Sequence, residues 1–287
     1  MKQILKKIIR KLFVYSLNAS RKENNYEEFI DKLEKILPSL KDQHNFLNNN
    51  EEEDDEYLKL KKRNHHAFQL LFTLEIIKQY KEIQDVDNIS IVDIGDSSGN
   101  HLLQLQDLDK DIKKIASVNL DVKAVEKIRN KGIEAYHCRA EELLEKYDLK
   151  ANFFISYQML EHLTDPIRFL HSISESNKNG LNACDRFIIS IPYQKQSRVG
   201  FWHMRINDTQ TIRDAEDIHI YELSPEDWRM LAEFSGWEVV SDKIYYQYPK
   251  WHWLYFTKYL WKKFDFEGFY IMELKINNKW SKLYESW

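Results

Sequence analysis

Residues 90–101 read Ser-Ile-Val-Asp-Ile-Gly-Asp-Ser-Ser-Gly-Asn-His, an apolar run followed by two glycines four positions apart. The β-branched residues of Ser90–Ile94 predict a strand, and the amphipathic residues of Asn100–Leu108 predict a helix. Gly95 and Gly99 permit positive φ and close approach of the backbone to a ligand, while the start of the helix offers free N–H groups. The segment therefore predicts a strand, a ligand-binding turn and a helix.

The same alternation continues along the chain. Further strands are predicted at Ile115–Leu120, Ile133–His137, Asn152–Ser156, Arg186–Pro192, Trp237–Tyr246 and Phe269–Lys275, and further helices at Val122–Lys131, Pro166–Asn177 and Pro225–Ser235. Ser224 is the expected N-cap of the last helix. Strands and helices at this spacing form βαβ units, so we predict an α/β fold with a doubly wound, mostly parallel sheet of seven strands. Ligands of such sheets bind beyond the carboxyl ends of the strands.

The chain before this region has a helical pattern. We predict an α-helical extension over residues 1–85, with helices at Met1–Phe13, Tyr26–Leu37 and Tyr57–Tyr80, and the main domain over residues 86–287. The six acids Glu51–Glu56 predict a solvated loop, because like charges at that density repel. The first helix has an apolar and a basic face. Packing on its own domain is favoured over contact of residues 1–13 with an anionic membrane.

Composition excludes several classes of protein. The chain has 287 residues, a formal net charge of −4 and a pI near 6.2, which argues against a nucleic-acid-binding protein. Cys138 and Cys184 form no CxxC pair, so we do not expect a cysteine-rich zinc site. With so few cysteines, we expect the protein to reside in a reducing compartment. The sequence holds no long uncharged apolar run, and its N-terminus is too charged for a secretory signal. We expect a cytoplasmic protein.

Asp93, Gly95 and Gly99, with Ser97 at the middle glycine position, resemble the first motif (D-x-G-x-G-x-G) of class I S-adenosylmethionine (SAM)-dependent methyltransferases. Other segments that resemble the family, in the expected order over about 150 residues, are Ser117–Asp121, Arg139–Leu143, Ser156–Pro166 (the "LEHL-DP" segment), Ile189–Pro192 and His219–Trp228. The last is similar to the subfamily related to ubiquinone-biosynthesis and polysaccharide O-methyltransferases. The resemblance implies a Rossmann-like class I methyltransferase fold.

The resemblance also implies SAM as cofactor. The matching positions are Asp93, Gly95, Asp96, Ser97, Gly99, Asn119, Leu120, Asp121, Arg139, Ala140, Glu141 and Gln158. Ser97, Asn119 and Arg139 depart from the family pattern. Asn119 stands where a carboxylate of the family normally accepts hydrogen bonds from both ribose hydroxyls. An amide offers one uncharged oxygen, so we expect the cofactor to lose binding free energy on the order of 1–2 kcal/mol unless Asp121 takes over this role. The departures leave open a catalytically silent binding protein that kept the fold.

The implied reaction is O-methylation of a saccharide, as in surface-polysaccharide biosynthesis, or of another small polar metabolite. A hydroxyl acceptor needs a base, for which His162 and His219, assisted by Glu161, are the candidates. Alternatively, Glu161 and His162 only cap their loop and order the helix that follows. His203, near Trp202 and Arg205, and Tyr193 are further candidates for the acceptor pocket or the base.

A metal site is the remaining alternative. Small-RNA 3′-terminal methyltransferases, which this chain also resembles, hold a divalent ion with a Glu-x-x-Glu-His run and a later His. Glu161, His162 and His219 match, but Gln158 replaces the first Glu. We predict no metal because the motif is incomplete, and the acidic pI disfavours an RNA acceptor. The aromatic segments Tyr245–Pro249 and Trp251–Trp261 are expected to serve packing more than sugar stacking.

Overall fold

The computed structural model describes residues 2–40, 56–178, 183–199 and 218–284 of the chain. The chain forms two compact units, which we call unit 1 and unit 2. Unit 1 comprises Met1–Asp85, Asn100–Lys110 and Ile244–Phe269, and unit 2 comprises Val86–Gly99, Asp111–Lys243 and Tyr270–Trp287. The predicted division of the chain at residue 85 stays a prediction.

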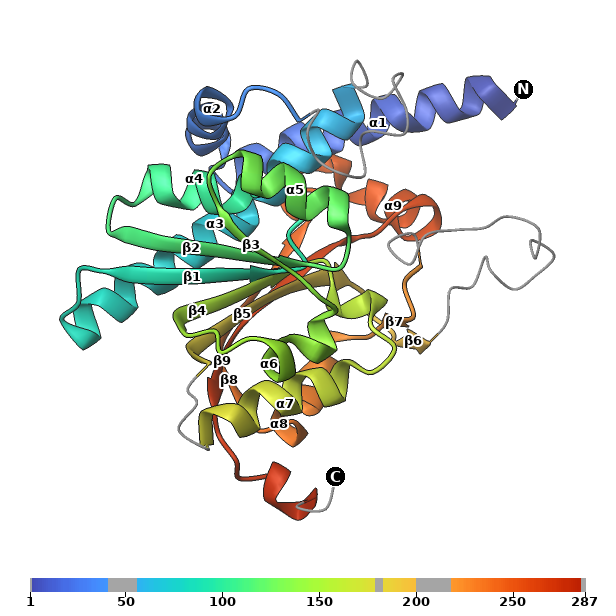
Figure 1. Cartoon of the computed structure of the whole chain (residues 1–287). Coiled ribbons are helices and arrows are strands. Elements are labelled where there is room, and N and C mark those ends of the chain that lie inside the picture. Colours follow the sequence, from blue (N-terminus) through green and yellow to red (C-terminus); the bar gives the residue numbers. More distant parts are fainter. Residues whose placement is uncertain (1, 41–55, 179–182, 200–217, 285–287) are drawn as a thin grey trace. The chain divides into compact units, whose positions relative to one another are not determined.

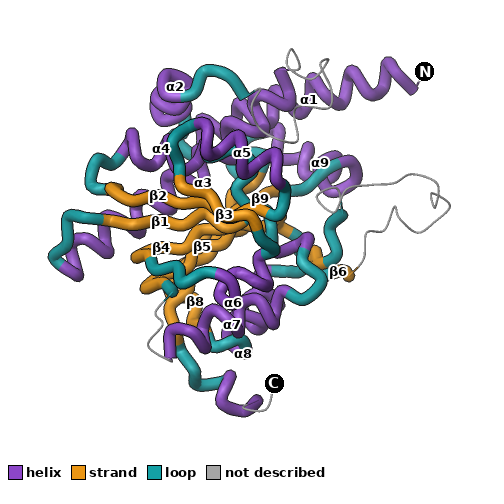
Figure 2. Tube along the Cα trace, viewed as in Figure 1, coloured by secondary structure: helices purple, strands orange, loops and turns teal. Residues whose placement is uncertain are grey.

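Seven strands form one sheet in the order β3-β2-β1-β4-β5-β9-β8 (Figures 1 and 2). They are β1 (Ile89–Ile94), β2 (Ile112–Asn119), β3 (Glu134–His137), β4 (Ala151–Tyr157), β5 (Cys184–Tyr193), β8 (Trp237–Tyr246) and β9 (Gly268–Ile276). The five strands β3, β2, β1, β4 and β5 run parallel to one another. β8 and β9 run antiparallel, since Asn277 N–H donates to the Gly236 carbonyl at one end and Gln247 N–H donates to the Glu267 carbonyl at the other. The predicted seven-stranded, mostly parallel sheet is confirmed.

The central strands are apolar on both faces because a parallel sheet is covered on both sides. Ile91 in β1, Phe154 in β4 and Ile188 in β5 are buried, and so are most of their neighbours along each strand. β8 lies at one end of the strand order and is less buried, with Val240 exposed. The core of unit 2 therefore follows the parallel strands.

The helices of unit 2 are α5 (Val122–Asn130), α6 (Leu143–Lys146), α7 (Pro166–Lys178) and α8 (Pro225–Phe234). α7 packs on the sheet through Phe169, which contacts Phe187 of β5 edge to face. The indole N–H of Trp237 donates to the Leu170 carbonyl, with N and O 2.9 Å apart. At the start of α8 the Ser224 hydroxyl accepts from the Asp227 N–H, so the predicted N-cap is confirmed.

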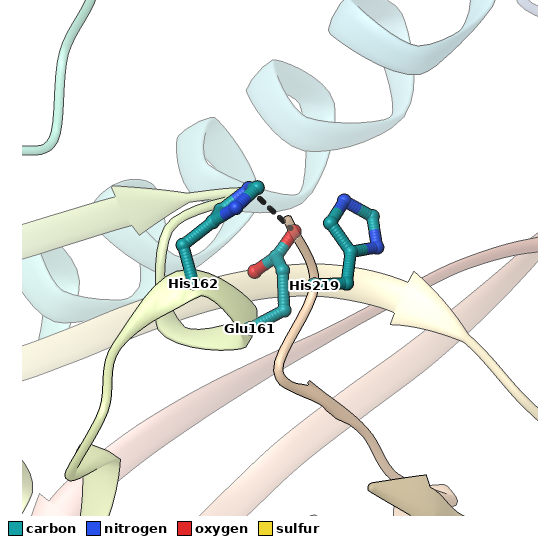
Figure 3. A group of neighbouring side chains, drawn as sticks. All are labelled: Glu161, His162 and His219. Carbon is teal, nitrogen blue, oxygen red and sulfur yellow. Dashed lines mark ion pairs between the residues drawn. The ribbon is translucent and has the colours of Figure 1, made fainter. Parts of the chain in front are cut away.

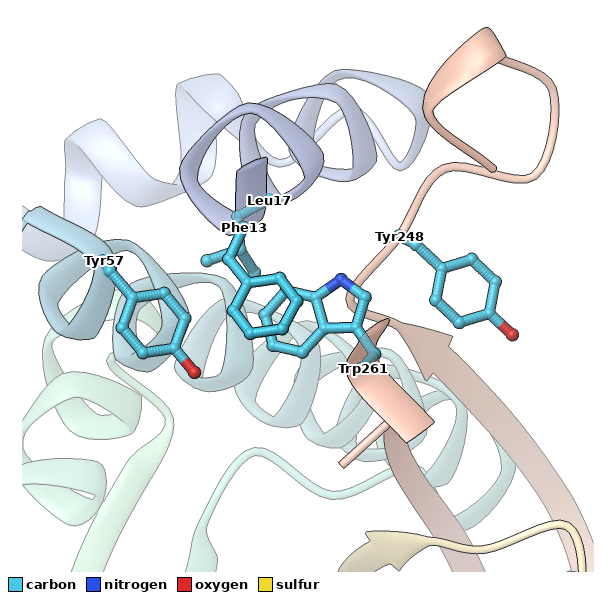
Figure 4. Close-up of a cluster of buried hydrophobic side chains, with 5 residues drawn as sticks. All are labelled: Phe13, Leu17, Tyr57, Tyr248 and Trp261. Carbon is cyan, nitrogen blue, oxygen red and sulfur yellow. The ribbon is translucent and has the colours of Figure 1, made fainter. Parts of the chain in front are cut away.

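The helices of unit 1 are α1 (Lys2–Glu23), α2 (Glu27–Ile36), α3 (Glu56–Gln84), α4 (Asn100–Leu108) and α9 (Lys258–Phe264), with the 3₁₀ helix η6 (Trp253–Thr257) before α9. Phe13 and Leu17 of α1 are buried in a cluster with Tyr57, Tyr248 and Trp261 (Figure 4). The rings of Phe13 and Trp261 stack with centroids 3.8 Å apart. The first helix thus packs its apolar face within its own unit, as expected, and it runs ten residues beyond the predicted Phe13.

Several sequence predictions lie outside the described residues. They are the acids Glu51–Asp55 and the residues Trp202, His203 and Arg205. Glu56, the last acid of the predicted loop, is instead the first residue of α3. None of the described helices is long and apolar enough to cross a membrane.

Candidate functional site

The predicted ligand loops meet at one edge of the sheet. Ile94 at the end of β1 pairs with Val118 of β2, and Asn119 at the end of β2 pairs with His137 at the end of β3. Tyr157 at the end of β4 pairs with Ser190 of β5. Because these strands are parallel, the loops after β1, β2, β3 and β4 all leave the same carboxyl edge, where ligands of such sheets bind.

The turn after β1 depends on its two glycines. Gly95 and Gly99 have φ of 91° and 76°, a region that side chains disfavour. A Cβ on Gly95 would lie 2.6 Å from Cγ of Met159, and one on Gly99 would lie 2.7 Å from Cδ1 of Ile133. The glycines therefore allow the turn to pack against neighbouring loops, a reason for glycine in addition to the predicted approach of a ligand.

Two aspartates shape the same turn. Oδ1 of Asp96 accepts from the N–H groups of Ser98 and Gly99, at 3.0 and 2.8 Å, and so fixes the turn from inside. Asp93 is buried at the end of β1, and burial raises the pKa of its carboxyl well above its ordinary value. Ser97, at the position of the family's middle glycine, is only half-buried. The turn is thus held by protein groups while Ser97 faces partly outward.

The loop after β2 is joined to the first turn. The Asn119 amide donates from Nδ2 to the Asp96 carbonyl, 2.6 Å away, and its Oδ1 accepts from the Asp121 N–H. Asp121 caps α5 by accepting from the Lys123 N–H. Both polar groups of Asn119 therefore hold the loops, although Oδ1 can accept a second hydrogen bond. Leu120 is 56% exposed here, an apolar side chain left uncovered beside the predicted ribose position.

The predicted positions after β3 and β4 also lie at this edge. The Cys138 N–H donates to the Asn119 carbonyl, which joins the third loop to the second. Arg139 is exposed and pairs with Glu141, with Nη2 and Oε1 3.1 Å apart, and Ala140 between them is half-buried. Gln158, directly after β4, has a φ of 56°, and its backbone N–H donates to the Ser190 carbonyl. The structure thus brings the four predicted cofactor segments together.

Glu161 is buried on the 3₁₀ helix η3 (Leu160–His162), close to the same edge. Among the described residues, no donor meets hydrogen-bond geometry with either of its carboxylate oxygens. Its Oε1 lies 4.0 Å from Nε2 of His162. Burial raises the pKa of Glu161 to about 7, against the opposing attraction of His219. The carboxyl is therefore poised to exchange a proton near neutral pH.

His162 and His219 flank Glu161 (Figure 3). Nδ1 of His162 donates to the Ile218 carbonyl at 2.8 Å, and Nδ1 of His219 donates to Oε1 of Glu222 at 3.1 Å. The two rings lie edge to face with centroids 4.7 Å apart. Because each Nδ1 carries a proton, each neutral ring has its lone pair on Nε2. We call Glu161, His162 and His219 the acid–histidine cluster.

Sequence reasoning missed the residues that orient His219. Glu222, on β7 (Tyr221–Glu222), is buried and also pairs with Arg198 on β6 (Arg198–Val199). Burial favours the neutral acid, but hydrogen bonds from His219 and Arg198 outweigh it and lower the pKa of Glu222. The spacing of three residues between His219 and Glu222 was the available signal. Arg198 gave none.

The acid–histidine cluster permits two kinds of chemistry. The ligand atoms of its three residues all lie within 4.8 Å of one another. Two imidazole nitrogens and a carboxylate can bind a divalent transition metal. The same Nε2 atoms can instead accept a proton from an acceptor hydroxyl. Both uses would place the reacting group of a substrate at the edge of the sheet that carries the predicted cofactor loops.

No protein-family model matches the chain, and no curated protein sequence matches it. Among solved structures it is similar to the O-methyltransferase from a trans-AT PKS multienzyme of Brevibacillus brevis in complex with S-adenosyl-L-homocysteine, with a TM-score of 0.52 and 11% identity over 82% of this chain and 80% of that chain. A putative sarcosine dimethylglycine methyltransferase from Galdieria sulphuraria gives a TM-score of 0.49 and 12% identity, over 76% of this chain and 88% of that chain. The first likeness confirms the predicted class I methyltransferase fold.

Proposed function

We propose that the chain is a SAM-dependent O-methyltransferase. The observation that supports this most is the network of backbone and amide hydrogen bonds that joins the loops after β1, β2 and β3. It links Gly95 to Val118, Asn119 to Asp96 and Cys138 to Asn119. Loops joined in this way form a preorganised surface, which lowers the entropy lost when a ligand binds.

The residues at this edge suit the parts of SAM. Leu120 and Val122 are exposed apolar side chains next to the end of β2, and they would pack against the adenine. Asn119 Oδ1 and Asp121 would accept hydrogen bonds from the ribose hydroxyls. The turn of Gly95–Gly99, with Asp93 and Asp96, would face the methionine part. SAM supplies an activated methyl group on a sulfonium. Arg139, Ala140, Glu141 and Gln158 complete the proposed contacts.

The acid–histidine cluster would receive the acceptor hydroxyl. Methyl transfer needs alignment of the nucleophile with the methyl carbon, so positioning supplies most of the acceleration. Removal of the hydroxyl proton would fall to Nε2 of His162 or His219, and Glu161, titrating near pH 7, would take part in the proton balance. The proposed acceptor class, a saccharide or another small polar metabolite in the cytoplasm, rests on the sequence resemblance.

A second candidate is metal-assisted transfer to vicinal hydroxyls, such as those of an RNA 3′ end. The convergence of three ligand atoms within 4.8 Å favours it. So does the way each histidine donates its Nδ1–H to an oxygen, the usual support of a metal-binding imidazole. A divalent ion held by Glu161, His162 and His219 would lower the pKa of an acceptor hydroxyl. The absence of a metal stays a prediction.

The first experiment is a calorimetric titration with S-adenosylhomocysteine. Binding that Gly95→Val removes would support the proposal, because a branched side chain cannot fit beside Met159. A lack of heat with either S-adenosylhomocysteine or SAM at millimolar concentration would indicate the silent binding protein.

The second experiment separates base from metal. A panel of saccharides is assayed for methyl transfer with and without a chelator. For a histidine base, His162→Gln and His219→Gln should lower turnover roughly 10²–10⁴-fold with cofactor affinity and melting temperature nearly unchanged, and the chelator should have no effect. Loss of activity on chelation, with recovery in Mn²⁺ or Co²⁺, would assign the cluster to a metal and direct the search to vicinal hydroxyls. Full rate in both variants would leave Tyr193 and His203 as candidates.

A further inference from the structure

Unit 1 carries a set of large aromatic side chains that face water. In the segment 251–264, Trp251 is 90% exposed, Trp253 72% and Tyr259 68%. Phe256 and Phe264 are exposed as well. Aromatic side chains of this size are normally buried, and exposed apolar groups in one segment mark an interaction surface more often than a chance arrangement. These five exposed rings are therefore not explained by packing within unit 1.

The segment is firmly anchored. Trp261 is fully buried against Phe13 (Figure 4), and its indole N–H donates to the Ser16 hydroxyl at 3.1 Å. The Glu23 carboxylate at the end of α1 accepts from the N–H groups of Lys250 and Trp251, at 2.9 and 3.1 Å. The exposed rings are thus presented by a fixed backbone, and their exposure is a property of the fold.

Helix α1 and the aromatic segment are both strongly basic. Residues 2–23 and 250–264 together hold eleven Lys or Arg and one acid, a net charge of +10, in a chain whose net charge is −4. α1 packs against η6, so the two basic segments are neighbours in unit 1. Lys258 Nζ lies 3.9 Å from the ring centre of Tyr255 and 4.9 Å from that of Tyr259. The exposed rings are therefore accompanied by cations.

We propose that this aromatic–basic surface (Trp251, Trp253, Phe256, Tyr259 and Phe264 with Lys250, Lys258, Lys262 and Lys263) docks unit 1 on an anionic lipid bilayer. Tryptophan and tyrosine favour the headgroup level of a membrane, and lysine stems lie along apolar groups while the ammonium reaches the lipid phosphates. The basic helix α1 adds to the attraction toward anionic lipid.

The residue types favour lipid over single-stranded RNA. All four cations of segment 250–264 are lysines, whereas RNA is usually bound by arginines that stack on bases and pair with phosphates. One face of the Trp253 ring is occupied, because Phe256 stacks on it with centroids 6.0 Å apart. Ile8 of α1, which is about half exposed, has no aromatic ring on which a base could stack, but it adds to an apolar membrane contact.

The test is co-sedimentation of the full chain with vesicles. Phosphatidylcholine vesicles are compared with vesicles that contain roughly one-third phosphatidylglycerol, at about 0.1 M and about 0.5 M NaCl. We expect binding to the anionic vesicles alone, and weaker binding at the higher salt concentration. Trp251→Ala with Trp253→Ala, and Lys262→Glu with Lys263→Glu, should each weaken partitioning on the order of tenfold or more.

The matched control is Lys114→Glu with Lys123→Glu, which makes the same change in net charge at two exposed lysines of unit 2. It should bind almost as well as the wild type. Melting temperatures of all variants verify that each folds. Failure to sediment with anionic vesicles, or an equal loss in the control, would overturn the proposal. So would binding of a single-stranded RNA oligonucleotide through the same tryptophans without any binding to vesicles.

Discussion

The side-chain amide of Asn119 donates a hydrogen bond to the backbone carbonyl of Asp96, with Nδ2 and O 2.6 Å apart. This contact joins the loop after β2 to the glycine turn after β1. Asn119 is buried, so its amide cannot exchange this partner for water without a change in the loop. The amide at a position where a carboxylate is usual is thus a structural part of the proposed cofactor site.

The first prediction concerns Asn119→Asp. Sequence reasoning alone expects this change to tighten cofactor binding, because it restores a carboxylate. With the contact to Asp96 in place, we expect the reverse: an ionised aspartate cannot donate, and its oxygen would face the carbonyl. Affinity for S-adenosylhomocysteine should fall roughly tenfold and unfolding should become easier by about 1–3 kcal/mol. Calorimetry and urea denaturation measure the two effects.

Asn88→Asp makes the same chemical change at an exposed loop position just before β1 and should alter neither quantity appreciably. Asp121→Ala removes the cap of α5 and should cost about 1 kcal/mol of stability. Tighter binding in Asn119→Asp at unchanged stability would show that the contact with Asp96 is dispensable.

The second prediction uses two glycines with similar backbone conformations. Gly95 and Gly132 have φ of 91° and 80°, but a Cβ on Gly95 would collide with Met159 whereas one on Gly132 would meet nothing within 4 Å. Gly132→Ala should cost only the conformational strain, about 1 kcal/mol. Gly95→Ala should cost clearly more and abolish S-adenosylhomocysteine binding. If adding Met159→Ala to Gly95→Ala restores part of the stability, the collision is the cause; equal losses in the two single variants would rule it out.

Local pattern predicted the seven strands of the large sheet but not the short strands β6 and β7 or the full length of α1. The apolar and basic pattern fades after Phe13, yet the helix continues to Glu23. Ser16 and Ser20 are buried there because their hydroxyls contact the carbonyls of Gln247 and Tyr246, at 3.1 and 2.6 Å. Polar residues that are satisfied by partners more than two hundred positions away carry no local signal. The end of this helix therefore required the structure.

The candidate site shows the same limit. The resemblance to a family indicated Glu161, His162 and His219, and the structure brings their ligand atoms together. The resemblance did not indicate Arg198. Arg198 contacts Glu222 because these two residues are paired in the antiparallel register of the short strands β6 and β7. Such a contact depends on the register in which two distant segments pair, and the residue types along the sequence do not show this register.

The third prediction concerns Glu222 as a positioning residue. Its carboxylate accepts from Nδ1 of His219 and pairs with Arg198, so it fixes both the tautomer and the direction of the imidazole. Glu222→Ala should lower kcat roughly 10–100-fold with S-adenosylhomocysteine affinity unchanged, since Glu222 lies outside the proposed cofactor loops. Glu222→Gln keeps an oxygen that accepts from Nδ1 and should recover most of the rate. If Glu222→Ala turns over at the wild-type rate, His219 does not depend on this contact for its role.

The last prediction is a dependence of stability on pH that arises from Glu161. Burial raises its pKa in the folded chain from 4.5 to about 7, so between these values the folded state binds the proton more firmly than the unfolded state. The contribution of Glu161 to stability is therefore complete below pH 4.5 and is lost as the pH rises to about 7. Glu161→Gln is permanently neutral and lacks this loss. The difference in free energy of unfolding between Glu161→Gln and the wild type should therefore change by roughly 3 kcal/mol in favour of the variant between pH 5 and pH 8. Urea denaturation in the presence of a chelator measures this difference. Parallel pH profiles for the two proteins would contradict the assignment, and a gain in wild-type stability at pH 8 on adding Mn²⁺, absent from Glu161→Gln, would show that the ionised carboxylate binds a metal.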